Sequence, residues 1–304
     1  MNTNFRHSLL IPCYNAAKYV DDFLLQLTNL NSKFNEVLFY DDASTDDTVH
    51  LLEKNGQKVI KGTKNMGPGY ARNQLAYAAK EKYIHFHDID DEIAHDFLEQ
   101  VNLKLSLSDT DVIIGYADWI DKHTRNSLIL WKYHEVHLQE DPLSYLITHP
   151  LGIINTVYKK STFLNIGGFN EKFKCWEDAD LNVKLAAANA SFQVIDNIIA
   201  WSLRHNNGIS NDQKMCWNCR LKFLESYLTN YLGLVDKNIF KQELKKVQTA
   251  LINMGNFNSL ITIFNLNKKY QLNIPNTKAK LIYASNIILP SSWLKKILSS
   301  LTKK

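Results

Sequence analysis

Long hydrophobic runs are missing from this sequence. No segment of about 18 consecutive apolar residues occurs, which is roughly the length that a membrane-spanning helix needs. The first ten residues also lack the apolar core of a signal peptide. We therefore expect a cytoplasmic protein without a spanning helix.

Cysteine is scarce as well. The chain has four cysteines, which fits a reducing compartment and does not indicate a disulfide framework. Cys216 and Cys219 have the spacing of half a zinc or redox site, but they lie in a helical pattern with no second Cys or His pair nearby. No zinc or redox site is predicted there.

The composition is otherwise that of a soluble globular protein. The 304 residues are 45% hydrophobic and 22% charged. This length suffices for one large α/β domain and an appendage. We place the boundary after residue 213, so that residues 1–213 form the main domain and residues 214–304 form a helical, basic C-terminal region.

Charge is distributed unevenly between these two parts. Residues 1–213 hold 20 Lys and Arg against 28 Asp and Glu, whereas residues 214–304 hold 15 against 3. A basic segment attracts nucleic acid or an anionic membrane surface. Residues 287–298 interleave apolar side chains, Trp293 and lysines, a pattern typical of helices that lie on membranes. We therefore predict an anionic inner-membrane surface as a partner, with a solvated helical face as the alternative, and no nucleic acid.

Strand and helix patterns alternate through the first half of the chain. Short apolar runs alternate with segments whose apolar residues recur at helical spacing. This order predicts an α/β fold with a mostly parallel central sheet and helices on both faces. The predicted strands are 8–11, 37–40, 59–60, 83–87, 111–114 and 155–158, with further strands around Val194 and Trp201. Helical spacing is predicted for 20–27, 48–54 and 68–79, and further helices open near residues 96 and 176.

Polar clusters follow three of these strands. They lie at residues 12–15, 41–46 and 88–91. Ligands of parallel sheets bind beyond the carboxyl ends of the strands, so these clusters are expected to form one site. Carboxylates crowded together, as at Asp88, Asp90 and Asp91, are stabilised by a cation or by an array of hydrogen-bond donors. For Asp88–Asp91 the alternative is a solvated acidic loop, and for Asp42 it is a helix N-cap or an Asx turn.

An ordered set of motifs resembles the GT-A fold family 2 glycosyltransferases, which use nucleotide-activated sugars. The resemblance covers about residues 7 to 210. Two departures are modest: Ala43 stands where glycine is frequent, and Cys13 replaces a small polar residue. The motifs are Leu10–Asn15, Tyr40–Thr48, Asn65–Asn73, Asp88–Asp91, Gly167–Phe169 and Glu177–Leu181.

The resemblance implies a set of residues that bind the nucleotide. Asp42 would accept a hydrogen bond from the uracil N3 group, because a carboxylate is an acceptor for an imide N–H. Arg72 would approach the nucleotide, since its guanidinium suits carbonyl or phosphate oxygens; a surface position on its helix is the alternative. The remaining predicted donor contacts are Pro12, Tyr14, Asn15, Asp88 on the ribose, and Arg204 beside phosphate.

The resemblance also implies a metal site and a general base. Asp90 would bind Mg²⁺ or Mn²⁺, with Asp91 in support and His205 completing the metal shell. Asp178 would take the proton of the attacking hydroxyl in an inverting reaction. Glu177 would support the base or bind the acceptor, and Trp176 would offer an apolar platform to a sugar ring. Acids that merely begin a helix are the alternative for Glu177 and Asp178.

The predicted function is therefore transfer of a hexose or N-acetylhexosamine from a UDP-sugar to a hydroxyl group. The predicted acceptor is a glycan or glycolipid such as a lipooligosaccharide, lipopolysaccharide or capsule precursor. A sugar-nucleotide nucleotidyltransferase is a rival, but it would show a Gly-rich basic loop after the first strand, and a dehydrogenase would show GxGxxG there. A non-catalytic membrane-surface module is a rival from another class.

Overall fold

The computed structural model describes residues 5–204, 212–256 and 258–274. The chain divides into two compact units between Gly208 and Ile209. The predicted domain boundary after residue 213 lies a few residues further along the chain.

The first unit is built on one mixed sheet of nine strands. The strand order is β3-β2-β1-β4-β8-β6-β9-β5, and β7 pairs with β6. The first four strands run parallel, as does β9 beside β6, while β5, β7 and β8 pair antiparallel with their neighbours. The strands are β1 His7–Cys13, β2 Glu36–Asp41, β3 Val59–Lys61, β4 Tyr83–Phe86, β5 Glu92–Ile93, β6 Val112–Asp121, β7 Ser127–Trp131, β8 Thr156–Lys159 and β9 Phe192–Arg204.

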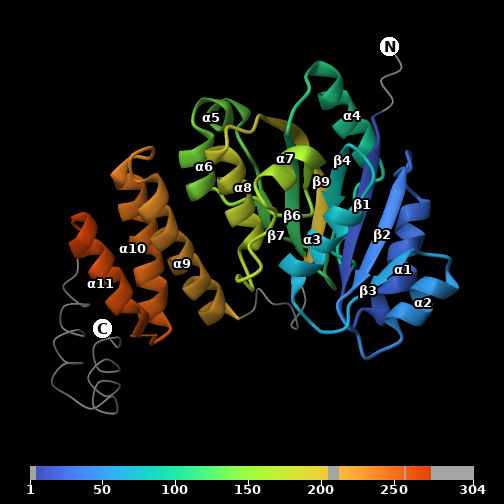
Figure 1. Ribbon diagram of the computed structural model, residues 1–304, viewed down its shortest axis with the longest axis horizontal. Coiled ribbons are helices and arrows are strands. Elements are labelled where there is room, and N and C mark those ends of the chain that lie inside the picture. The colour runs from blue at the N-terminus through green and yellow to red at the C-terminus, as the bar shows by residue number, and fades with distance from the viewer. Residues whose placement is uncertain (1–4, 205–211, 257, 275–304) are drawn as a thin grey trace. The chain divides into compact units, whose positions relative to one another are not determined.

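Helices cover both faces of this sheet (Figure 1). Leu9 and Ile11 of β1 pack with Val20 and Phe23 of α1 on one face. On the other face, Phe86 of β4 meets aromatic rings from α7 and from the turn after it. Strands covered on both sides are apolar throughout, which is why their sequences show little alternation. The helices are α1 Ala17–Thr28, α2 Thr48–Lys54, α3 Pro68–Ala78, α4 Phe97–Leu107, α5 Glu135–Glu140, α6 Pro142–Thr148, α7 Lys160–Asn165 and α8 Glu177–Ala187.

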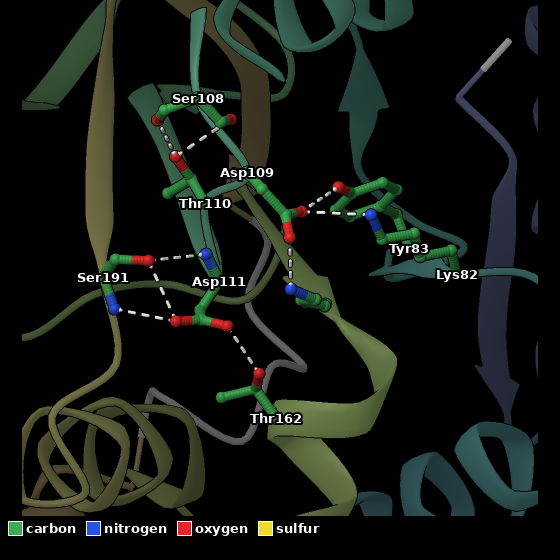
Figure 2. A network of polar contacts seen from close by, with 9 residues as sticks. Lys82, Tyr83, Ser108, Asp109, Thr110, Asp111, Thr162 and Ser191 are labelled. Carbon is green, nitrogen blue, oxygen red and sulfur yellow. Dashed lines mark hydrogen bonds and ion pairs between the residues drawn. The ribbon is translucent and has the colours of Figure 1, made fainter. Parts of the chain in front are cut away.

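A polar network joins the strands at the amino ends of β4, β6 and β9 (Figure 2). Asp109 accepts hydrogen bonds from Lys82 at 3.0 Å and from Lys159 at 2.7 Å. Asp111 accepts from the backbone and hydroxyl of Ser191 at 3.0 and 2.9 Å and from Thr162 at 2.6 Å. The network fastens the end of the sheet opposite to the predicted site, so the carboxyl ends remain available for ligands.

The segment 118–137 is more regular than its sequence indicates. It contains few apolar alternations, and no strand was predicted within it. In the structure β6 continues through Asp121 and returns as β7, and Asp121 accepts backbone and side-chain hydrogen bonds from Thr124 in the turn. The hairpin forms because β6 is anchored along its length by β9, which supplies pairing that a local pattern cannot reveal.

The second unit is helical in its described part. Helices α9 Gln213–Tyr231, α10 Lys237–Asn253 and α11 Asn258–Tyr270 compose it. A buried ion pair between Arg220 and Glu243, at 2.9 Å, joins α9 to α10. Cys216 and Cys219 are buried on α9 and are not joined in a disulfide. No helix among the described residues is both long and apolar enough to cross a bilayer. The predicted membrane-surface segment 287–298 lies outside the described residues.

Candidate active site

The loops after β1 and β2 are tied together at the carboxyl edge of the sheet. The N–H of Asn15 donates to Ser44 Oγ at 2.8 Å, and Asn15 Oδ1 accepts from the N–H of Thr45 at 2.8 Å. Tyr14 projects outward with 51% of its surface exposed, while Pro12 lies within β1 opposite Tyr40 of β2. Hydrogen bonds to the loop after β2 therefore fix the predicted nucleotide loop, and the Tyr14 ring is exposed on it.

Backbone conformation shows why glycine is frequent at the position that Ala43 occupies in this chain. Ala43 has φ of 63°, in the left-handed region that glycine adopts without steric cost. Glycine is thus the unstrained residue at this position, and alanine carries a small conformational cost beside Asp42.

Asp42 organises the loop that leads into α3. It is buried, and its two oxygens accept from the N–H groups of Met66 at 2.9 Å and Gly67 at 2.7 Å. Each carboxylate oxygen has a second lone pair, so contact with a base stays a prediction. The helix-cap alternative is wrong, because the donors belong to a loop more than twenty residues away.

Arg72 is the central buried charge of the site. Its guanidinium donates from Nη2 to Asp88 Oδ1 at 2.7 Å and from Nη1 to Glu177 Oε1 at 2.6 Å. It also lies over the Phe169 ring at 5.7 Å. Burial lowers the pKa of this guanidinium, but the charges of Asp88 and Glu177 outweigh burial and hold the pKa above its ordinary value. The surface alternative for Arg72 is therefore wrong.

The acidic cluster forms a turn after β4. The N–H of Asp91 donates to the carbonyl of Asp88 at 3.1 Å. Asp91 is buried, and its Oδ1 accepts from the N–H of Leu203 in β9 at 2.8 Å. Burial first, then the charges of Asp90 and Asp88, raise the pKa of the Asp91 carboxyl well above its ordinary value. Asp91 thus anchors the turn, while Asp88 keeps 34% of its side chain exposed and Asp90 is partly exposed.

The donor set of this turn suits a cation that arrives with a substrate. Among residues 5–204, 212–256 and 258–274, no group of three His, Cys, Asp or Glu side chains could hold a metal ion by itself. Mg²⁺ is commonly bound through one or two carboxylates together with substrate phosphates and water. The partly exposed oxygens of Asp88 and Asp90 fit that arrangement. His205, the other predicted ligand, lies outside the described residues.

The predicted base lies in the first turn of α8. Glu177 is buried against Arg72, and Asp178 follows it with its Oδ1 accepting from the N–H of Ala179 at 2.8 Å. Burial first, then the charge of Glu177, raise the pKa of Asp178 to about 7, while the Ala179 N–H and the Arg72 charge oppose this rise. Trp176 precedes them with φ of 66°, an unusual conformation for a bulky residue and one that occurs at functional sites.

The glycine turn before α8 approaches a side chain of α3. Gly167 and Gly168 both have positive φ, and a Cβ on Gly168 would lie 2.4 Å from Asn73 Oδ1. Asn73 accepts from the N–H of Phe169 at 2.9 Å and donates to its carbonyl at 3.0 Å. The close contact of this glycine turn is with Asn73, which was not singled out from sequence.

Arg204 ends β9 at the same edge. Its guanidinium lies over the Trp119 ring at 4.3 Å. Trp119 in turn meets Trp131 of β7 with ring centroids 5.5 Å apart. Neither tryptophan was predicted as a site residue, because the pairing of β6 with β7 that brings them together is not visible in the local sequence.

The Arg72 guanidinium links the acidic turn after β4 to the first turn of α8, where Asp178 lies. A carboxyl whose pKa is about 7 can accept a proton near neutral pH. The acidic turn can bind a cation, which in turn can bind a diphosphate. Arg72 pairs with both Asp88 of that turn and Glu177 beside Asp178. Such a site suits attack of a hydroxyl group on a carbon whose leaving group is a diphosphate.

Relatives with known names share parts of this sequence. An uncharacterized glycosyltransferase of Haemophilus influenzae is 36% identical over 104 residues, which are 32% of this chain and 42% of the relative. The poly(ribitol-phosphate) beta-N-acetylglucosaminyltransferase TarS of Staphylococcus aureus is 31% identical over 188 residues, 59% of this chain and 32% of TarS. The hyaluronan synthase of Pasteurella multocida is 27% identical over 276 residues, 87% of this chain and 26% of the synthase. The chain spans less than half the length of each.

Solved structures share the fold. S. aureus TarS 1–349 in complex with UDP-GlcNAc superposes with a TM-score of 0.66 at 21% identity, over 89% of this chain and 82% of that one. The mannosyltransferase PcManGT of Pyrobaculum calidifontis, in complex with GDP-Man and Mn²⁺, gives 0.58 at 15% identity, over 94% and 88%. At these identities the likeness establishes the fold, which confirms the predicted GT-A α/β architecture.

A family model for glycosyl transferase family 2 matches residues 8–166. This match includes the loops after β1 and β2, Arg72 and the acidic turn. Because it covers slightly more than half of the chain, the protein belongs to glycosyl transferase family 2.

Proposed function

We propose that this glycosyltransferase moves a hexose or N-acetylhexosamine from a UDP-sugar to a hydroxyl group of a glycan acceptor, with inversion at the anomeric carbon. The observation that carries the proposal is the pair of Arg72 contacts, which bring Asp88 of the acidic turn and Glu177, the neighbour of Asp178, onto one guanidinium. The pKa of Asp178, raised to about 7 chiefly by burial, is consistent with a base. A UDP-sugar is supported by the solved TarS complex, which contains UDP-GlcNAc.

The donor would lie across the loops of the first half of the sheet. Pro12, Tyr14 and Asn15 would contact base and ribose, Asp42 would accept from the base, and Asp88 would contact ribose. Arg72 would act from beneath them, because its guanidinium is buried while Asp88, its partner in the acidic turn, is partly exposed. When bound at Asp90 and His205, Mg²⁺ or Mn²⁺ would neutralise negative charge on the leaving diphosphate.

Asp178 would act on the acceptor. Its carboxylate would take the proton of the acceptor hydroxyl as that oxygen bonds to the anomeric carbon, and UDP would leave from the opposite side. Glu177 would keep Asp178 basic through its negative charge, and Trp176 would contact a sugar ring. The family 2 match and the presence of both Asp90 and Asp178 favour the enzyme over the membrane-surface alternative.

The acceptor would be a precursor of a bacterial surface glycan, such as lipooligosaccharide, lipopolysaccharide or capsule. Two relatives support this class: TarS is a poly(ribitol-phosphate) beta-N-acetylglucosaminyltransferase, and the Pasteurella relative is a hyaluronan synthase. We further propose that residues 214–304 form a separate region that meets the cytoplasmic face of an anionic membrane.

A donor screen tests the proposed reaction. With Mn²⁺, we expect at least one UDP-hexose or UDP-N-acetylhexosamine to release UDP about tenfold faster than GDP-mannose or CMP-sialic acid, because the base-binding loops select uracil. EDTA should remove the activity, and added Mn²⁺ or Mg²⁺ should restore it. Equal use of GDP-mannose, or full activity in EDTA, would contradict the donor or the metal proposal respectively.

Removal of the basic tail tests the membrane proposal. A chain lacking residues 280–304 should bind vesicles containing anionic lipid more weakly, and the difference should shrink at high salt because each lysine contributes a screened attraction. Cosedimentation measures the bound fraction. The variant Lys295→Gln/Lys296→Gln separates charge from apolar area and should lose part of the salt-sensitive binding. Equal binding of the truncated and intact chains would refute the proposal.

A further inference from the structure

A row of side chains crosses three strands beside the acidic turn. In the pairing of β6 with β7, Trp119 lies opposite Ile129, and in the pairing of β6 with β9 it lies opposite Ser202. Residues directly opposite each other in a sheet point to the same face. Ile129, Trp119 and Ser202 therefore lie side by side on one face of the sheet.

A second tryptophan extends this row. Trp131 lies opposite Ala117, which shares a face with Trp119 because side chains two residues apart in a strand point the same way. The two indoles meet edge to face, with an interplanar angle of 60°. Both are partly exposed, and Ile129 exposes 45% of its surface. The Trp131 indole N–H is shielded from solvent and has no hydrogen-bond acceptor within the described part of the chain.

Positive charge lies on the same surface. Arg204 follows Ser202 by two residues, and its guanidinium stacks on Trp119. A stacked guanidinium keeps its N–H donors in its plane, where they can bind a carboxylate or phosphate in bidentate fashion. Lys122 is adjacent only through its backbone, whose N–H donates to the Arg204 carbonyl at 3.4 Å, because its ammonium lies over the Tyr19 ring. Asp121, opposite Arg204, accepts from N–H groups of the β6–β7 turn. The Arg204 guanidinium is therefore the group that can bind an anion here.

The surface adjoins the acidic turn on the side away from the donor loops. Asp91 is held by the Ser202 hydroxyl and by the N–H of Leu203. Asp88, at the other end of the turn, is held by Arg72 of α3. A ligand on the tryptophans would thus contact the turn from the β9 side, while the donor loops follow β1 and β2.

We propose that Trp119, Trp131 and Arg204 form an acceptor subsite for a sugar ring that carries an anionic group, either phosphate or carboxylate. The indoles would cover the apolar C–H face of the ring. Arg204, which the family resemblance places beside the donor phosphate, would instead bind the anion of the acceptor, because its guanidinium lies over Trp119. The subsite deepens the proposed function and rests on it only for the identity of the ligand as acceptor.

Binding of small probe sugars tests the subsite without turnover. The full-length chain is titrated with glucose 6-phosphate, glucuronic acid, methyl β-glucoside and inorganic phosphate, by ligand-observed NMR, with UDP as a separate arm. We expect the two anionic sugars to bind more tightly than the neutral glucoside and than phosphate alone. Trp119→Leu should weaken the anionic sugars about tenfold, a loss of about 1.4 kcal/mol, and Trp119→Phe should retain most of the affinity.

Matched variants separate the subsite from general damage. Arg204→Gln should abolish the preference for anionic over neutral sugar. Trp217→Leu replaces a partly exposed tryptophan in the helical unit and should change neither the affinity for the sugars nor that for UDP. Anionic sugars that bind Trp119→Leu as tightly as wild type would overturn the proposal, as would an equal loss of UDP affinity in that variant. Failure of the donor proposal would appear instead as absent UDP binding with sugar binding intact.

Discussion

Asp178→Asn should reduce kcat for sugar transfer by about a thousandfold, because an amide cannot accept the proton of the attacking hydroxyl. The substitution keeps the size of the side chain and an oxygen that can accept from the Ala179 N–H, so the start of α8 should be preserved. The donor KM should stay within about threefold, since the residue acts on the acceptor. Transfer is measured by UDP release with the best donor and acceptor.

A remote carboxylate provides the control. Asp109→Asn alters an acid at the opposite end of the sheet and should keep transfer within about twofold of wild type. Retained transfer in Asp178→Asn, or an equal loss in both variants, would contradict the assignment of the base.

The pH profile follows from the same pKa. The base must be ionised, so log kcat/KM should rise with slope one below about pH 7 and level off above it. Glu177→Gln removes the neighbouring charge that raises the pKa of Asp178 and leaves more of the Arg72 charge to lower it. Both changes lower that pKa, so the acid limb should move to lower pH. A limb that stays in place would show that another group titrates.

The stability of the fold should fall as pH rises, whereas kcat/KM should rise. The pKa of Asp178 in the folded protein, about 7, lies above its ordinary value of 3.8. Ionising Asp178 therefore costs stability, and this cost grows as pH rises from about 4 through 7. Asp178→Asn should escape the cost, so its thermal midpoint at pH 8 should equal or exceed that of wild type. Loss of catalysis without loss of stability would show that the Asp178 carboxyl serves catalysis and not the fold.

The parallel half of the fold could be predicted from sequence because its signals are local. Each early strand is a short apolar run, and α2 and α3 begin at the predicted residues Thr48 and Pro68. The antiparallel half could not be predicted in the same way. The pairing of β8 between β4 and β6 joins segments far apart in sequence, and β7 forms only because β6 is already held by β9.

In the site, too, the residues that belong to local motifs could be predicted, and the contacts between distant segments could not. The acidic turn and Asp178 were predicted from motifs, and the structure places Asp88 and Glu177 on one guanidinium. Sequence pointed to Arg72 as a donor contact but did not reveal that it bridges these two acids, because the three come from α3, the end of β4 and α8. The Trp119–Trp131 pair was missed for the same physical reason: its members meet through strand register.

Arg72→Met should be the most destabilising change at the site. It removes the only charge shown to pair with Glu177 in the described structure, where Glu177 is 9% exposed and Arg72 is 5% exposed. Removing one partner of a buried ion pair typically costs about 3–5 kcal/mol, because the other charge is left buried and unpaired. The free energy of unfolding, measured in urea at pH 7.5, should fall by about that amount. Arg125→Met is the matched control, since Arg125 binds Glu92 in bidentate fashion at the surface and should cost less than about 1 kcal/mol.

The double variant Arg72→Met/Glu177→Gln decides whether charge is the cause. If the unpaired carboxylate is what destabilises Arg72→Met, replacing it by a neutral amide should recover part of the lost free energy, so the two changes should be less than additive. If Arg72 only fills space, the two costs should add. The pH dependence of catalysis gives a second test of the charge effect, because loss of the Arg72 charge raises the pKa of Asp178. Arg72→Met should therefore shift the acid limb to higher pH, opposite to Glu177→Gln, and a shift in the same direction would refute an electrostatic link between Arg72 and the base.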